Sequence, residues 1–96
     1  MKIIKTAVAG TMESSDIMIT LSPAAEGISI DLDSTVKEQF GGQICAVIRE
    51  TLQKMGITAA EVSAVDKGAL DCTVKARTEA AALRAGDTQA DWEGLP

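Results

Sequence analysis

The chain has 96 residues, which is enough for one domain with a single hydrophobic core. Its formal net charge of -5 disfavours nucleic acid and anionic membranes as partners, because both repel an acidic surface. The sequence contains no histidine, which excludes a Ser-His-Asp or Cys-His catalytic site built from this chain alone.

Two strands joined by a short loop are predicted first. Apolar and polar residues alternate over residues 17–22 and again over 28–33, which is the period of half-buried strands. Pro23 and Gly27 interrupt the pattern between them. Because the connection is short, the two strands are expected to pair as an antiparallel hairpin.

One long helix is predicted to follow, beginning at Ser34 and ending at Gly56. The hydroxyl of Ser34 can cap the first turn, and Gly56 supplies a left-handed stop onto which Ile57 packs. Gly41 and Gly42 fall inside this helix at a cost of about 1 kcal/mol each relative to alanine, which a close approach to a sheet or a local kink would explain. The buried stripe of the helix is expected to consist of Val36, Phe40, Ile44, Val47, Ile48, Thr51, Leu52 and Met55.

A second hairpin and a short helix complete the predicted fold. Residues 60–65 read as a strand, Gly68 permits a turn, and residues 70–77 alternate strictly between apolar and polar side chains. The alanine-rich segment 78–85 is predicted to be a short helix that ends at Gly86. The predicted fold class is α+β in the order ββαββ, with two antiparallel hairpins forming a sheet packed on one long helix, plus a short C-terminal helix.

Residues 1–86 are expected to form one domain, and residues 87–96, which lack periodicity, a mobile tail. No signal peptide or membrane-spanning stretch is recognisable. Cys45 and Cys72 lie in apolar patterns without metal-ligand spacing. Both thiols are therefore expected to be buried and reduced in a cytoplasmic protein without a metal site.

The segment 7–16 places two adjacent hydroxyls, Ser14 and Ser15, among small residues. A serine without a neighbouring base is suited to be an attachment point that another enzyme modifies, whereas the simpler alternative is a polar loop before a strand. Ser34 follows an aspartate, like the serine of the all-helical acyl carriers in their Asp-Ser-Leu triplet. Its next residue is Thr35, however, and a role as helix cap is sufficient to explain it.

The segment 7–16, the pair Phe40-Gly41 and the segment 66–72 together resemble one family, the acyl carrier, or gamma, subunit of citrate lyase. The most specific part is the Gly-Thr-Met-Glu-Ser run that ends at Ser14 and is followed by Asp16. The resemblance implies a non-catalytic carrier with a fold unlike that of the helical carriers. It also implies that Ser14 carries a phosphoribosyl-dephospho-CoA group through a phosphodiester.

By the same resemblance, the terminal thiol of this arm holds acetyl and citryl groups while citrate is cleaved to acetate and oxaloacetate. The expected partners are the alpha and beta subunits of citrate lyase, the transferase that installs the arm (a holo-carrier synthase) and the ligase that acetylates it. Glu13 and Asp16 would either guide docking onto basic surfaces or merely solvate the loop. The alternatives are the related carrier of malonate decarboxylase, which uses the same kind of arm, and a small interaction module without a prosthetic group.

Overall fold

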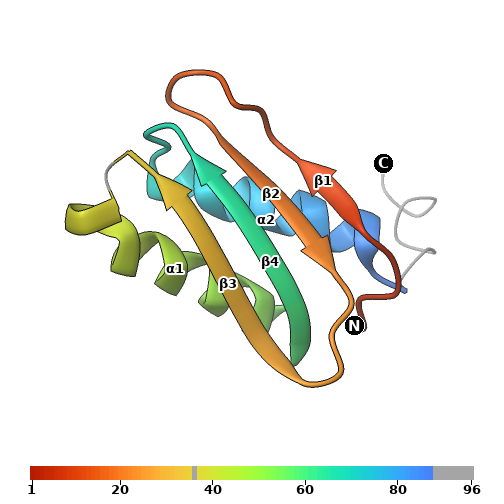
Figure 1. The fold of residues 1–96 in the computed structure, drawn as a ribbon. Helices are drawn as coiled ribbons and strands as arrows, with labels where there is room; N and C mark the ends of the chain where they lie inside the picture. The colour runs from red at the N-terminus through yellow and green to blue at the C-terminus, as the bar shows by residue number, and fades with distance from the viewer. Residues whose placement is uncertain (36, 88–96) are drawn as a thin grey trace.

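Two helices pack on one face of a four-stranded sheet in the computed structural model, which describes residues 1–35 and 37–87 (Figure 1). The α+β class is confirmed, and the fold is not an all-helical bundle. Apart from Asp87, the expected tail 87–96 lies outside the described residues. The elements are β1 (Ala7–Ala9), β2 (Ile17–Ser22), β3 (Gly27–Ser34), α1 (Lys37–Lys54), β4 (Ala59–Asp66) and α2 (Asp71–Ala85).

The strand order is β1-β2-β4-β3, so that β4 lies between the two strands that the sequence predicts to be neighbours. β2 pairs antiparallel with β4, and β3 pairs parallel with β4. The predicted hairpin of β2 and β3 is therefore wrong. A parallel neighbour requires a crossover connection, and α1 provides one between β3 and β4. The short strand β1 pairs antiparallel with β2 and was not predicted.

Residues 71–85 form one helix, so the predicted strand at 70–77 and its hairpin are wrong. Cys72 and Ala76 are exposed, although a buried strand face would contain both. The helical period continues through the alanine-rich second half of α2, where helix propensity is high, and it prevails over the local alternation. The predicted end of this helix before Gly86 is confirmed. The buried residues of α2 recur three or four positions apart: Val74, Thr78, Ala81, Ala82 and Ala85.

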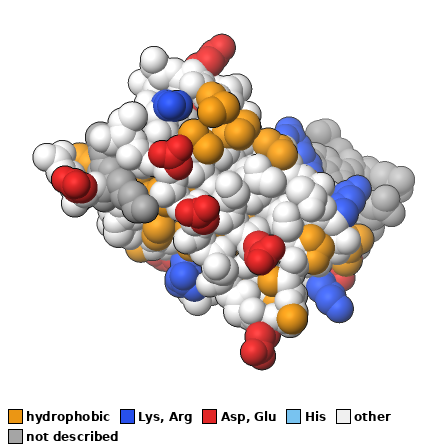
Figure 2. Space-filling model, viewed as in Figure 1, with side chains coloured by type: hydrophobic (Ala, Val, Ile, Leu, Met, Phe, Trp, Pro, Cys, Tyr) orange, Lys and Arg blue, Asp and Glu red, His pale blue; other side chains and the backbone are white. Residues whose placement is uncertain are grey.

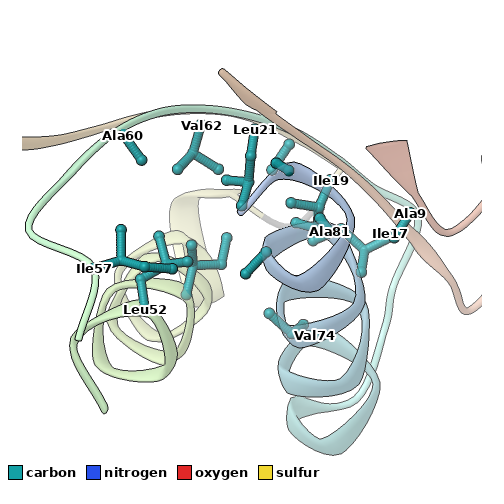
Figure 3. Close-up of a cluster of buried hydrophobic side chains, with 14 of the residues drawn as sticks. Ala9, Ile17, Ile19, Leu21, Leu52, Ile57, Ala60, Val62, Val74 and Ala81 are labelled. Atoms are coloured by element: carbon teal, nitrogen blue, oxygen red, sulfur yellow. The ribbon is translucent and has the colours of Figure 1, made fainter. Parts of the chain in front are cut away.

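The hydrophobic core lies between the sheet and the two helices (Figure 3). Ile17, Ile19 and Leu21 of β2 are fully buried and face both helices. The predicted stripe of α1 is confirmed for its central and C-terminal part, which buries Ile44, Ile48, Thr51 and Leu52 and partly buries Val47 and Met55.

The predicted burial of Phe40 is wrong, because 54% of its surface is exposed. Phe40 lies in the first turn of α1, which Figure 1 shows beyond the end of the sheet, so no strand covers it. Val36, the other N-terminal member of the predicted stripe, lies outside the described residues. The helix itself begins at Lys37, three residues after Ser34.

The predicted C-terminal stop of α1 is confirmed. Gly56 has a positive φ of 78°, the left-handed conformation that glycine adopts without strain. The N–H of Gly56 donates to the carbonyl of Gln53, and the N–H of Ile57 donates to the carbonyl of Leu52, both at 3.0 Å. These two bonds form a Schellman motif, and Ile57 folds back into the core with 1% exposure.

The opposite face of the sheet carries polar side chains, as the alternation in β3 predicts. Ser29 and Asp31 of β3, and Glu61 and Ser63 of β4, are exposed there. Figure 2 shows acidic side chains on this side, spread over a largely uncharged surface. Among the described residues, no helix is long and apolar enough to cross a membrane.

Replacing Gly42 with alanine should raise the free energy of unfolding by about 0.5–1 kcal/mol. Gly42 lies exposed inside α1, and an added Cβ would meet no other atom within 4 Å. Urea unfolding measures the change. Gly56→Ala is the matched control and should destabilise the protein, because alanine is strained at its positive φ. A Gly42→Ala protein that unfolds at lower urea than the parent would contradict this account of α1.

Candidate functional site

Residues 10–16, called here the serine loop, connect β1 to β2 at one end of the sheet (Figure 1). Two backbone hydrogen bonds fix this loop to the turn after β4. The N–H of Ser15 donates to the carbonyl of Lys67 at 2.8 Å, and the N–H of Lys67 donates to the carbonyl of Asp16 at 2.9 Å. The predicted turn at residues 66–68 is therefore present, but it leads into α2 and supports the serine loop.

Ser14 occupies the tip of a tight turn. The N–H of Asp16 donates to the carbonyl of Glu13 at 3.2 Å, which closes the turn around the two serines. Ser15 has a φ of 66°, the positive value that a type II turn requires at its third residue. Both serines are exposed, and within residues 1–35 and 37–87 no hydrogen bond engages the Ser14 hydroxyl. This hydroxyl is accessible to the active site of another enzyme.

Asp16 ties the serine loop to α2 through both of its carboxylate oxygens. Oδ1 accepts from Nε of Arg77 at 3.0 Å and from the N–H of Ile17 at 2.7 Å. Oδ2 accepts from Nη2 of Arg77 at 2.9 Å and from Oγ1 of Thr11 at 2.7 Å. The bidentate pair is the stronger kind of ion pair because it adds two charge-assisted hydrogen bonds in a fixed geometry.

The electrostatics of Asp16 follow from these contacts. The hydrogen bonds from Arg77 and then from Thr11 hold the pKa of the Asp16 carboxyl well below its usual range, and the same pairing raises the pKa of Arg77. With 13% of its side chain exposed and its charge balanced, Asp16 is a support of the loop. Of the two acidic residues considered for docking, only Glu13 presents an exposed carboxylate.

Gly10 permits the close approach of the two ends of the serine loop. Its φ is 90°, and a Cβ built there would lie 1.8 Å from the carbonyl oxygen of Ile17. That distance is far shorter than any van der Waals contact, so a side chain at this position would force the backbone apart. Glycine at position 10 is thus explained by a steric requirement in a fixed loop.

Replacing Asp16 with asparagine should destabilise the protein at pH 7, and the difference should shrink progressively as the pH is lowered below about 4. The pKa of Asp16 is lower in the folded protein than the value of about 4 in an unfolded chain. Its contribution to stability is therefore complete above that unfolded value, declines as the pH falls below it, and is lost only when the pH passes through the much lower folded-state pKa. Urea unfolding of both proteins at several pH values measures the difference. Asp33→Asn, at an exposed position, is the control and should change stability little. A loss that is equal at all pH values would contradict the ion-pair account.

Ser34, the other serine considered for attachment, takes part in the support of the neighbouring turn. It is the last residue of β3, and its hydroxyl donates to Oδ2 of Asp66 at 2.8 Å. Asp66 is 1% exposed, and its Oδ1 accepts from the N–H of Ala69 at 3.0 Å. These bonds shape the turn that holds Lys67 against the serine loop.

The two cysteines are free thiols. Cys45 is half-buried on α1, whereas Cys72 is exposed, so the predicted burial of Cys72 is wrong. The cause is the change from strand to helix, which places position 72 on the outer side of the first turn of α2. Within the part of the chain that the structure describes, no group of three His, Cys, Asp or Glu side chains could hold a metal ion.

Known proteins share both the sequence and the fold. A family model described as ACP, malonate decarboxylase delta subunit, matches residues 4–85. The citrate lyase acyl carrier protein of Oenococcus oeni is 61% identical over 97 residues, covering 99% of this chain and 100% of that protein. That of Streptococcus uberis is 58% identical over 96 residues, covering 99% and 95%. The chain belongs to the citrate lyase acyl carrier protein family. The resemblance drawn from residues 7–16, 40–41 and 66–72 is thereby confirmed.

A solved structure of low sequence identity has a similar fold. A chain in the crystal structure of a Pseudomonas malonate decarboxylase hetero-tetramer in complex with malonate superimposes with a TM-score of 0.74. The match covers 85% of this chain and 84% of the other at 22% identity. At that identity the likeness concerns the fold alone.

Sequence reasoning missed Arg77, a residue that holds the serine loop of this carrier chain. The alternating pattern assigns Arg77 to the solvated face of a strand, whereas it lies on α2 and reaches Asp16, which is 61 positions away. The available signal was the helical spacing of Val74 and Thr78 on either side of it. That spacing indicates a helix at position 77, although it does not identify the partner.

Proposed function

We propose that this chain is the acyl carrier subunit of citrate lyase and that Ser14 bears its phosphoribosyl-dephospho-CoA arm through a phosphodiester. The observation that carries the proposal is an exposed Ser14 hydroxyl on a fixed turn, in a chain 58–61% identical over 99% of its length to citrate lyase acyl carrier proteins. The arm supplies a thiol that carries acetyl and citryl groups as thioesters. The protein supplies the tether, which keeps the acyl group at high effective concentration near its partners.

The residues around Ser14 suit such an attachment. The hydroxyl oxygen is exposed, and a substituent on it would extend away from the turn into solvent. Asp16 and Arg77 fix the base of the loop behind it, and Gly10 lets the loop close. The chain thus holds the attachment oxygen in a defined place while leaving the arm free to reach other proteins.

The arm could instead be attached at Ser15, which the sequence alone leaves open. The N–H of Ser15 is engaged by the carbonyl of Lys67, and its φ of 66° is uncommon for a residue other than glycine. Modification at Ser15 would therefore act on the more constrained residue of the turn. These features favour Ser14 as the attachment site.

The proposed partners are the alpha subunit, which exchanges acetyl for citrate, and the beta subunit, which releases oxaloacetate. The transferase that installs the arm and the ligase that acetylates it are further proposed partners. The proposed location is the cytoplasm, where the two free thiols would remain reduced. Malonate decarboxylase is the weaker alternative, because the solved relative from that complex is only 22% identical.

The holo carrier by itself should not cleave citrate. The sequence has no histidine, and the carboxylates of Asp66 and Asp16 are engaged in structural bonds. Citrate is incubated with acetylated holo carrier alone and with the carrier plus alpha and beta subunits, and oxaloacetate is measured. We expect oxaloacetate only in the complete mixture. Turnover by the carrier alone would refute the carrier assignment, and malonate-dependent activity with the partners of a decarboxylase would favour the alternative.

A further inference from the structure

An apolar groove of about 390 Å³ lies between the first two turns of α1 and the turn that precedes α2. Gln43 of α1 donates to Oδ2 of Asp71 of α2 at 2.8 Å, which links the two walls and fixes the shape of the groove. Two large apolar side chains on it are exposed, Phe40 to 54% and Leu70 to 71%. The lining residues are Phe40, Gln43, Ile44, Gly68, Ala69, Leu70 and Asp71.

Neither core packing nor helix formation explains Leu70. Its side chain is mostly exposed, so it contributes little to the core. Leu70 is also the N-cap residue of α2 and makes no side-chain capping bond. Serine, threonine, aspartate and asparagine are favoured at that position, and leucine is among the poorest choices. An exposed leucine at a helix cap, beside an exposed phenylalanine, is typical of a binding surface.

The groove and the serine loop form one fixed unit. Lys67, immediately before the groove residue Gly68, exchanges backbone hydrogen bonds with Ser15 and Asp16 at 2.8 and 2.9 Å. Figure 1 shows the serine loop, the turn before α2 and the start of α1 at the same end of the molecule. An enzyme that closes on Ser14 must therefore cover surface that adjoins the groove.

The charges around the groove indicate what kind of partner fits it. Asp71 lines the groove, Glu38 lies in the first turn of α1, and Glu13 is exposed on the serine loop. Lys67 is an exposed cation in the adjoining turn. With a net charge of -5 over the chain, these carboxylates complement a basic surface.

We propose that this groove is the docking site for the transferase that loads Ser14, and that the transferase inserts an apolar side chain flanked by lysine or arginine. The inference rests on the proposed function, because it assumes that Ser14 is the residue loaded. Phe40 and Leu70 provide the apolar contact, and Asp71 of the groove together with the exposed Glu13 of the serine loop orients the approach. The groove thus serves recognition, while the serine loop presents the reacting oxygen.

The test compares the apo full-length chain with Leu70→Ser, Phe40→Ala and the matched control Ile4→Ser as substrates of the transferase. Ile4 is 56% exposed and hydrogen-bonds through its N–H to Ala85, at the far end of α2. We expect KM to rise about tenfold or more for Leu70→Ser and Phe40→Ala with kcat little changed, and KM to stay at the parent value for Ile4→Ser. For the parent, KM should increase with salt.

Urea unfolding distinguishes a loss of docking from a loss of stability, because serine is a better N-cap residue than leucine and should not destabilise α2. Leu70→Ser should unfold at the same or higher urea concentration than the parent while being loaded poorly, which a merely structural role would not produce. Unchanged KM for both groove variants, with the arm still on Ser14, would overturn the docking proposal alone. A parent chain loaded at another residue would overturn the proposed function. Self-association that Leu70→Ser abolishes would assign the groove to a second copy and also overturn it.

Discussion

Replacing Ser14 with alanine should abolish attachment of the arm and all citrate cleavage by the reconstituted complex, while the free energy of unfolding changes by less than about 0.5 kcal/mol. The loss is complete because the hydroxyl oxygen is the proposed point of covalent attachment. The small effect on stability follows because Ser14 is exposed and its hydroxyl makes no hydrogen bond to the described residues. Intact mass after treatment with the transferase measures loading, and urea unfolding of the apo protein measures stability.

Ser15→Gly is the matched control for this experiment. It removes the neighbouring hydroxyl and places glycine at a φ of 66°, which glycine adopts without strain. This variant should be loaded normally and be at least as stable as the parent. If Ser15→Gly loses the arm while Ser14→Ala keeps it, the attachment site is Ser15. If Ser14→Ala unfolds as readily as a core variant, the serine loop is structural.

Leu52→Ala should lower the free energy of unfolding by about 2–5 kcal/mol, a large part of the stability of a small domain. Leu52 is 0% exposed and packs from α1 into the core beneath the sheet (Figure 3). Phe40→Ala is the matched comparison, because the sequence pattern places both residues on the same buried stripe. Because 54% of Phe40 is exposed, Phe40→Ala should lower the free energy of unfolding clearly less than Leu52→Ala does. Equal losses of stability in urea unfolding would mean that Phe40 is part of the core, and would contradict its place in an exposed groove.

The parts of the fold that the sequence predicts well are those specified by neighbouring residues. The alternation over 17–22 and 28–33 places β2 and β3 to within a residue or two, and Gly56 with Ile57 marks the end of α1. Period and caps are local properties that a single segment contains. Strand order is not local. Nothing within β2 or β3 indicates that β4 lies between them.

The error at residues 70–77 shows how a short segment can satisfy two periods. Positions 70, 72, 74 and 76 alternate as in a strand, while Val74 and Thr78 also fit a helix that continues to Ala85. Tertiary packing decides between them, since α2 packs against β1, β2 and α1 and buries its alanines. A strand at position 77 would place Arg77 on a solvated face, so the local pattern does not predict its pairing with Asp16.

The candidate site likewise contains residues that a local motif indicates and residues that only the fold brings together. The family motif around Ser14 indicates the attachment residue from a contiguous stretch of sequence. The support of that residue comes from Lys67 and Arg77, which are brought to the serine loop by the fold. The groove residues Phe40 and Leu70 likewise read as core positions in a linear pattern, and their exposure is apparent only in three dimensions.

The central claim is that Ser14 bears the prosthetic arm, and mapping of that arm on protein purified from its native host tests it most directly. The holo protein is digested, and the peptide containing the serine loop is fragmented in a mass spectrometer. We predict that the mass of one phosphoribosyl-dephospho-CoA group lies on Ser14 and that Ser15 and Ser34 are unmodified. An arm on Ser15 or Ser34, or holo-active protein without an arm on this peptide, would contradict the account.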